Sequence, residues 1–187
     1  MILLDQRLET ERLLVRACRR GDGAFLTPLM TPAISRTVAL WPADLTIEAA
    51  EAIIEDHLNR AAAGIVFPGV ISLRNTGEVI GWMHIDREFA DAPSAGLSCW
   101  LATPHQRSGY ASETLGAAIR FAFEEMDIEL ITAGAQPTNH ASLGLMAKLG
   151  LARGEEEDVW AAARQRVERC VFWHLPRLEF LRNADTS

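Results

Sequence analysis

The order of strand-like and helix-like segments predicts an α/β (α+β) fold, with helices around one mixed sheet. A strongly helical pattern from Gly109 to Met126 separates two strand-like runs, Leu97 to Ala102 and Ile128 to Ala135. A hairpin pattern precedes this unit, and two further strand-like runs close the chain. No linker rich in Pro, Gly or Ser divides the sequence. We therefore expect one domain, residues 1–187, with a flexible tail at about 182–187.

The first half of the chain reads as one strand followed by helices. Leu13 to Ala17 is a short candidate strand. Asp22 stands where it could cap a helix that runs to about Met30. Thr46 then begins a clear helix, because an acidic first turn and apolar residues at helical spacing follow it. Gly64 is placed to end this helix.

The remaining segments follow from alternation and turn residues. Two strands, Val66 to Leu73 and Val79 to Ile85, flank a turn and predict the hairpin. A loop is expected over residues 103–108, and a helix from Asn139 or His140 to Gly150. The closing strands are expected at residues 159–160 and 167–174, and the acidic run Glu155 to Asp158 is interpreted as a solvated turn.

Charge and cysteine content exclude several function classes. The chain has 18 Lys and Arg against 25 Asp and Glu, a formal charge of −7, so it is not expected to bind nucleic acid. An acidic protein instead favours a cationic substrate such as an amine. Cys18, Cys99 and Cys170 form no CxxC pair, so neither a metal site nor a redox dithiol is predicted.

No segment of the sequence predicts a membrane protein. Charges at Asp5, Arg7 and Glu9 interrupt any signal-peptide run near the N-terminus. No stretch reaches the roughly 20 apolar residues that a membrane-spanning helix needs. The expectation is therefore a cytoplasmic protein.

The most informative stretch is the loop between the strand Leu97 to Ala102 and the helix that follows. The N-terminus of a helix has unpaired N–H groups and a positive dipole end, so a phosphate can bind there. Gly109 lets the backbone approach such an anion, and Arg107 can add a charge-assisted hydrogen bond. The alternative is an ordinary strand-to-helix turn. Neither GxxxxGK[ST] nor GxGxxG is present, so the phosphate-binding loops of those two motifs are excluded.

Three blocks of residues resemble one known family. Residues 106–113, QRSGYASE, are similar to the (Arg/Gln)-x-x-Gly-x-(Gly/Ala) motif of the GNAT N-acetyltransferase superfamily. Residues 9–16, ETERLLVR, are similar to the opening block of its ribosomal-protein N-terminal (RimJ/RimL-like) acetyltransferase branch. Residues 139–142, NHAS, with 148–151, KLGL, are similar to that branch's Asn-x-x-Ser and Lys-Leu-Gly-Phe block. The blocks occur in the family's order and span residues 9–151.

The resemblance implies a GNAT-like fold, in which helices flank a mixed, largely antiparallel central sheet. Its two central strands splay apart, here those ending near Ala102 and Ala135. Acetyl-CoA would be the acyl donor, with its pantetheine arm between the splayed strands, and an amine would be the acceptor. Asn139 would contact the cofactor arm. The remaining cofactor-binding residues implied are backbone groups of Leu101, Ala102 and Thr103, and the pyrophosphate loop Gln106, Arg107, Ser108, Gly109, Tyr110 and Ala111.

The family mechanism needs a group that stabilises the leaving thiolate and a base for the amine. Ser142 is the candidate for the first role, because Met146 stands where many members have a tyrosine; its alternative is a helix residue that bonds its own backbone. The branch's base, a glutamate, corresponds to Gly96. His84 is therefore the candidate base, unless it is only a packed strand residue.

Further expectations concern the acceptor, its pocket and the oligomer. His84, Asp86 and Glu88 would share one strand face. Trp41 would line the acceptor pocket, and Cys99 stands where the branch has a tyrosine. A protein N-terminal α-amine is the first expectation for the acceptor, and a small-molecule amine is the second. A non-catalytic acyl-CoA-binding module is the alternative function, and a homodimer is plausible because such folds have bare edge strands.

Overall fold

The computed structural model describes residues 3–184, which form one eight-stranded sheet in the order β1-β2-β3-β4-β5-β6-β8-β7. Every neighbouring pair is antiparallel except β5 and β6, which are parallel. The mixed, largely antiparallel sheet expected from the sequence is thus confirmed. The strands are β1 Arg7–Glu9, β2 Leu13–Ala17, β3 Val66–Leu73, β4 Val79–Arg87, β5 Ser94–Leu101, β6 Leu130–Ala135, β7 Ala152–Ala161 and β8 Arg166–Pro176.

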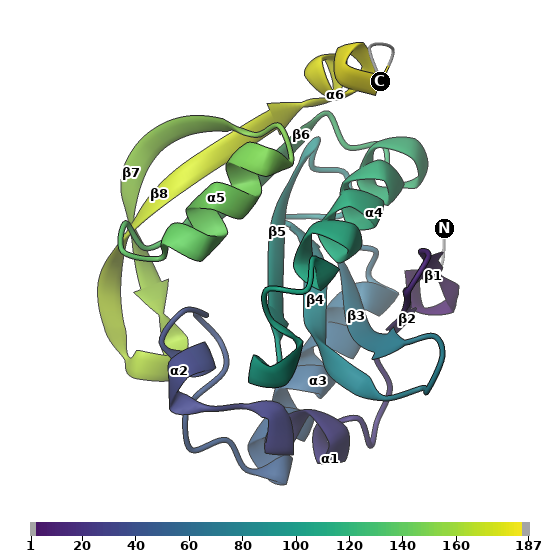
Figure 1. Cartoon of the computed structure of the whole chain (residues 1–187), viewed down its shortest axis with the longest axis vertical. Helices are drawn as coiled ribbons and strands as arrows, with labels where there is room; N and C mark the ends of the chain where they lie inside the picture. Colours follow the sequence, from purple (N-terminus) through teal and green to yellow (C-terminus); the bar gives the residue numbers. More distant parts are fainter. Residues whose placement is uncertain (1–2, 185–187) are drawn as a thin grey trace.

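Helices cover both faces of the sheet. In Figure 1, α4 and α5 lie in front of it and α3 lies behind it. The α-helices are α1 Gly23–Leu26, α2 Pro32–Ser35, α3 Ile47–Ala62, α4 Tyr110–Glu125, α5 His140–Lys148 and α6 Arg177–Ala184. Short 3-10 turns occur at η1 Leu3–Asp5, η2 Thr27–Leu29, η3 Thr103–His105 and η4 Ala162–Arg164.

Each face of the sheet has its own apolar core. On the α4 face, Leu115, Ile119 and Ala122 of the predicted helical stripe pack against buried strand residues such as Phe67 and Ile85. The second core lies under α1, α2 and α3, where the side chains of Trp41, Ile54, Trp82 and Trp100 come together. Because strand side chains alternate between faces, β4 and β5 contribute to both cores.

Local signals position the two long helices. The Thr46 hydroxyl accepts a hydrogen bond from the Ala49 N–H (3.1 Å), so Thr46 is the N-cap of α3 as expected. Gly64 follows the end of this helix in the left-handed conformation (φ 75°). Gly109 has the same left-handed geometry (φ 82°) immediately before α4.

The central strands part, as the family resemblance implies. The parallel pairing of β5 with β6 covers only three residue pairs and ends at Gly96 and Thr132. Beyond that point β5 continues along β4 to Leu101, while β6 continues along β8 to Ala135. The sheet therefore opens between β5 and β6 at the end where both strands finish (Figure 1).

Three local expectations need correction. Asp22 occupies the N-cap position of α1 without capping it; its buried carboxylate instead binds the Arg16 guanidinium (2.6 and 2.8 Å). Glu155 to Asp158 lies within β7 rather than in a turn, and Asp158 pairs with Arg169 at 3.1 Å. Residues 182–184 of the expected tail belong to α6, and 185–187 lie outside the described residues.

Candidate active site

The loop between β5 and α4 presents backbone N–H groups at a helix N-terminus. The first hydrogen bond of the helix runs from the Glu113 N–H to the Gly109 carbonyl (3.0 Å), so the N–H groups of the preceding turn have no intrahelical acceptor. Arg107 (φ 61°) and Gly109 both adopt positive φ angles, which turn the chain sharply into α4. The loop thus leaves backbone N–H groups at the start of α4, which is the geometry that an anion site requires.

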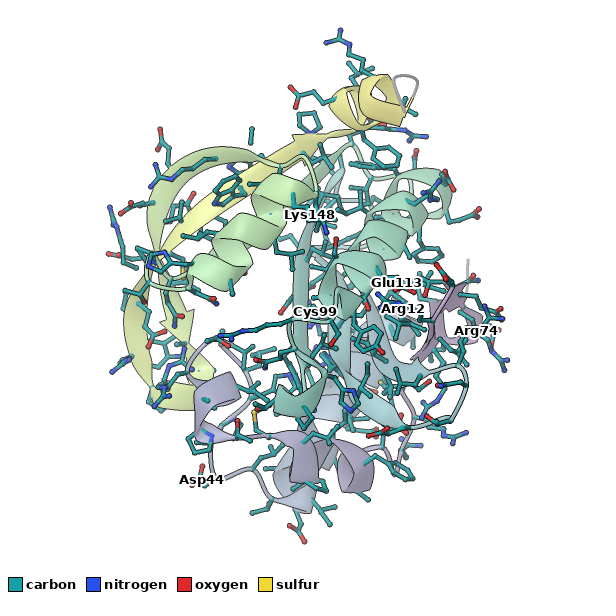
Figure 2. All side chains as sticks on the ribbon, in the orientation of Figure 1. Arg12, Asp44, Arg74, Cys99, Glu113 and Lys148 are labelled. Atoms are coloured by element: carbon teal, nitrogen blue, oxygen red, sulfur yellow. The ribbon has the colours of Figure 1, made fainter. Side chains whose placement is uncertain are left out.

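Arg12 joins this loop to the N-terminal strands. Its guanidinium binds Glu113 through Nε (2.7 Å), donates from Nη1 to the Ser108 carbonyl (3.0 Å) and lies 4.5 Å from the centre of the Tyr110 ring. The Thr10 hydroxyl donates to the same carboxylate (2.5 Å). Figure 2 shows Arg12 and Glu113 side by side at the start of α4.

The charge state of Glu113 follows from these contacts. Partial burial acts to raise the pKa of its carboxyl, but the hydrogen bonds from Thr10 and Arg12 outweigh burial and hold the pKa below its ordinary value. A charged Glu113 therefore keeps Arg12 in place. The sequence did not predict this arrangement, which connects two of the motif blocks and which we call the Arg12 clamp.

The backbone of β5 offers hydrogen-bonding groups to the opening between the strands. The Ala102 N–H is used, since it donates to the Ile80 carbonyl of β4 (2.8 Å). Bonding sides alternate along a strand, so the N–H groups of Leu101 and Cys99 point the other way, toward the opening. The Leu101 carbonyl accepts from the Gln106 side chain (2.9 Å). Along β5, the N–H groups that face the opening are therefore those of Cys99 and Leu101, and the Ala102 N–H is not among them.

Cys99 keeps its proton beside this opening. Burial raises the pKa of its thiol to about 12, so the side chain is a neutral, weakly polar group at physiological pH. It lies on the face of β5 that packs toward α4 (Figure 2).

The start of α5 brings Asn139 and Ser142 together. The Asn139 side-chain oxygen accepts from the Ser142 N–H (3.2 Å) and caps the helix, which leaves the amide NH₂ group of Asn139 for other contacts. Within residues 3–184, the Ser142 hydroxyl has no hydrogen-bond partner, so it does not bond its own helix backbone. Met146 one turn later is buried and cannot donate a proton.

A cavity of about 540 Å³ lies where the strands part, and we call it the central cavity. Its walls come from β4, β5, β6, β8 and the segment after α2. His84, Asp86 and Ser98 share the face of Trp82 and Trp100, so the cavity opens on the side of the sheet away from α4. Lining residues include Trp41, Arg60, His84, Asp86, Glu88, Gly96, Ser98 and Thr132.

A comparison with family models identifies the fold's relatives. Residues 12–152 match the acetyltransferase (GNAT) domain, which is most of the chain. The chain belongs to the GNAT acetyltransferase family. The expected family and fold are thereby confirmed, and the match supports an acetyl-CoA-dependent N-acetyltransferase. It gives no support to the non-catalytic alternative.

Individual relatives agree with this assignment. An uncharacterized N-acetyltransferase, YnaD, from Bacillus subtilis (strain 168) is 40% identical over 55 residues, which cover 29% of this chain and only 32% of the relative. Mycobacterium smegmatis RimJ in complex with CoA-disulfide superimposes with a TM-score of 0.79 at 17% identity, covering 95% of this chain and 90% of that one. The ribosomal-protein-S5-alanine acetyltransferase from Vibrio fischeri gives 0.75 at 18% identity, covering 92% and 97%.

The resemblance to the RimJ/RimL-like branch aligns that branch's glutamate with Gly96, and the register of the sheet shows what stands beside that position. Asp86 of β4 is directly opposite Gly96 of β5. Residues opposite each other in an antiparallel pair point to the same face of the sheet, about 5 Å apart. A Cβ at position 96 would meet only the Asp86 carbonyl oxygen, at 3.7 Å, so the space is open. The missing carboxylate thus has a neighbour, Asp86, which forms an ion pair with Arg60.

The surroundings of His84, the candidate base, change its protonation chemistry from that of an ordinary histidine. Its Nδ1 accepts a hydrogen bond from Trp82 Nε1 (3.3 Å), so the ring proton is on Nε2. Burial, with the nearby His57 and Arg60, lowers the pKa of His84 to about 3. A ring that stays neutral with its proton on Nε2 can donate a hydrogen bond but is a poor proton acceptor near pH 7.

Trp41 lines the central cavity, as expected, but it is also a core residue. Its side chain is only 2% exposed and packs edge-on against Trp82 and Trp100, with ring centroids 5.2 and 5.4 Å away. It therefore shapes the cavity wall as part of an aromatic cluster.

Residues 3–184 contain neither a candidate metal site nor a candidate membrane-spanning helix. Among residues 3–184, no group of three or more His, Cys, Asp or Glu side chains is arranged to hold a metal ion. In the same part of the chain, no helix combines the length and apolar character needed to cross a membrane.

Proposed function

We propose that this GNAT domain transfers the acetyl group of acetyl-CoA to a primary amine, with a protein N-terminal α-amine as the acceptor. One observation carries the proposal: β5 and β6 part beyond Gly96 and Thr132, the central cavity is lined by both strands there, and β5 leads on to the loop before α4. A donor and an acceptor can therefore approach the same point from opposite sides of the sheet. The RimJ and ribosomal-protein-S5 acetyltransferase folds support this choice of acceptor.

The residues present fit acetyl-CoA. The positive end of α4 and the loop 106–111 suit the pyrophosphate, and Arg107 can add a charge-assisted bond. The N–H groups of Cys99 and Leu101 suit the amide-bearing arm. Asn139 can reach the arm through its free amide group. Bound there, acetyl-CoA would supply a thioester, which amines attack directly.

Ser142 is proposed to stabilise the departing thiolate. Its hydroxyl is in the first turn of α5, the helix that follows β6, and no other described residue bonds to it. An O–H donor lowers the barrier only if it faces the developing negative charge, which the sulfur atom carries. The buried Met146 cannot share this role.

Asp86 is proposed to hold and orient the acceptor amine through a charge-assisted hydrogen bond. Its carboxylate lines the central cavity opposite the unoccupied space at Gly96, and Arg60 orients it. His84, two residues away on the same strand face, can donate from Nε2 to a carbonyl oxygen of the acceptor. The pair would fix both ends of an amine–carbonyl unit such as a peptide N-terminus.

Calorimetric titration with acetyl-CoA tests the donor site. Gly109→Trp should abolish binding, because the indole would fill the loop. Gly77→Trp is the matched control, since Gly77 also has a positive φ (73°) but lies in the β3–β4 turn with open space around it. Binding lost only in Gly109→Trp supports the loop. Absence of binding to the folded parent would refute the proposal, and binding without CoA release on any amine would favour the non-catalytic module.

The amine role of Asp86 is tested with two carboxylates of the same cavity. Asp86→Asn should lower kcat at least 100-fold with the acetyl-CoA Kd unchanged. Glu88→Gln is the control, because Glu88 lines the cavity rim but is exposed and lies beyond the end of β4. If Glu88→Gln loses the activity and Asp86→Asn keeps it, the assignment is wrong.

Location and assembly complete the proposal. A protein that consumes acetyl-CoA is expected in the cytoplasm, where the sequence also placed it. The edges β1 and β7 are each paired on one side only among the described strands, which leaves room for a homodimer. Light scattering after size-exclusion chromatography would measure the assembly directly.

A further inference from the structure

A second cavity borders the central cavity and has a different chemistry. It measures about 850 Å³ and is lined by the residues that follow α2, by the start of α5 and by the first residues of β8. We call it the arginine groove. Thr37, Gln136 and Glu168 line both cavities, so the groove adjoins the proposed acceptor site.

Positive charge dominates this groove. Arg36, Arg166 and Arg169 line it, against the single carboxylate of Glu168. The protein as a whole has a formal charge of −7, so the groove differs in sign from its surroundings. A concave surface of one charge concentrates ligands of the opposite charge.

The one carboxylate in the groove is already engaged. Glu168 binds Arg164 (2.6 Å) and Arg166 (2.7 Å) and accepts from the Gln136 side chain (2.7 Å). These hydrogen bonds hold its pKa at about 2 despite the opposing effect of burial. Glu168 therefore holds the side chains around it in place, and its carboxylate oxygens are already occupied and cannot readily bind a cationic ligand.

Arg36 remains available to a ligand. Its side chain is exposed and makes no hydrogen bond or ion pair with any of residues 3–184, although its carbonyl accepts from Gln136. Arg166 is exposed as well, with only Glu168 as a partner. Arg169 binds Asp158 and Glu156 on β7. Two of the three guanidinium groups can thus turn toward an anion in the groove.

We propose that the arginine groove binds acidic side chains immediately following the acceptor amine, so that the enzyme prefers peptides with an acidic N-terminal segment. This inference rests on the proposed transfer to an α-amine: the amine occupies the central cavity and the next residues run past Gln136 into the groove. Carboxylates of the second and third residues would meet Arg36 and Arg166. Guanidinium groups suit this task because they pair with carboxylates through two parallel hydrogen bonds.

Three peptides that differ only at positions 2 and 3 test the preference: Ala-Glu-Glu, Ala-Gln-Gln and Ala-Lys-Lys followed by one common sequence. CoA release is measured with the full chain at low salt and at high salt. We expect the Glu peptide to have a KM about fivefold to tenfold below that of the Gln peptide, with the difference shrinking at high salt. The Lys peptide should have the highest KM of the three.

Two variants decide whether the groove is responsible. Arg36→Gln should abolish most of the preference while leaving kcat for the Gln peptide unchanged. Arg120→Gln is the matched control, because Arg120 is another exposed arginine without a described partner, on α4 and outside both cavities. Preference lost in Arg36→Gln and kept in Arg120→Gln supports the proposal.

Other outcomes overturn it in distinguishable ways. Equal KM values for the three peptides would refute the proposal that the groove binds acidic side chains, but not the proposed transfer to an α-amine. CoA release with none of the peptides, while acetyl-CoA still binds, would refute the peptide acceptor and this inference with it. Inhibition by a short single-stranded RNA at lower concentration than the Glu peptide would assign the groove to nucleic acid instead.

Discussion

The Arg12 clamp predicts that a residue far from the reacting atoms controls acetyl-CoA affinity. Arg12→Met removes the side-chain bonds to Glu113 and to the Ser108 carbonyl. Because the Arg12 side chain is 44% exposed, we assign about 0.5 kcal/mol to each of three contacts, about 1.5 kcal/mol in all. In a chain of this length that loss lowers Tm by about 3–6 °C. If acetyl-CoA must re-order the loop on binding, the same energy raises Kd about tenfold.

Calorimetry and thermal unfolding separate a positioning role from a purely structural one. Arg20→Met is the matched control: Arg20 forms an exposed two-bond pair with Glu55 (2.7 and 2.8 Å), remote from α4. Both variants should lose stability, but only Arg12→Met should lose acetyl-CoA affinity. Arg12→Lys keeps the positive charge but lacks the planar guanidinium group. Its acetyl-CoA affinity should therefore lie between those of the parent and of Arg12→Met. An unchanged Kd in Arg12→Met, with Tm lowered as in Arg20→Met, would refute the reasoning.

Three other variants follow from the site and the core. Ser142→Ala should lower kcat about 100-fold and leave the acetyl-CoA Kd unchanged by calorimetry; undiminished turnover would remove Ser142 from the mechanism. Trp41→Ala should cost about 3–5 kcal/mol in urea unfolding, because Trp41 is 2% exposed between two other indoles, whereas Trp41→Phe should cost much less. Glu168 has its folded pKa depressed from 4.5 to about 2, so its stabilisation is present above pH 4.5 and is lost as pH falls toward 2. In Glu168→Gln, the free energy of unfolding should depend less on pH over that range than it does in the parent. An unchanged pH dependence would contradict the depressed pKa.

The fold was largely predictable because its elements carry local signals. The stripe Leu115, Ile119, Ala122 and the cap Thr46 each act within a few residues, and the structure confirms both helices. The turn predicted within β7 was wrong because that segment carries no local signal for a strand. Glu155 to Asp158 is polar throughout, and its strand forms through pairing with β8, where Arg169 neutralises Asp158. Partners more than ten residues away decide that segment, so its own composition pointed to a turn.

The site was predictable where one loop forms it and not where strands meet. Residues 106–111 could be proposed as the pyrophosphate loop because a glycine precedes a helix there and the residues around it resemble the family motif. Asp86, in contrast, gains its proposed role only from standing opposite Gly96, and hairpin length alone does not fix that register. His84 was favoured as the base from its ordinary pKa, but Trp82 and burial change its chemistry. Neither effect is visible in the sequence without the cavity around it.

The arginine groove shows why net charge is a poor guide to the acceptor. An overall charge of −7 favours a cationic partner, yet the surface next to the central cavity is positive. Arg36 and Arg166 are 130 positions apart and meet because the β7–β8 turn docks on the segment after α2: the Ala163 N–H donates to the Ala39 carbonyl (2.8 Å), and Arg164 donates to the Val38 carbonyl (2.7 Å). The same contact that closes one end of the central cavity thereby creates the charged groove beside it. Substrate preference in this protein is therefore expected to follow the local arrangement of arginines, which only the tertiary structure sets.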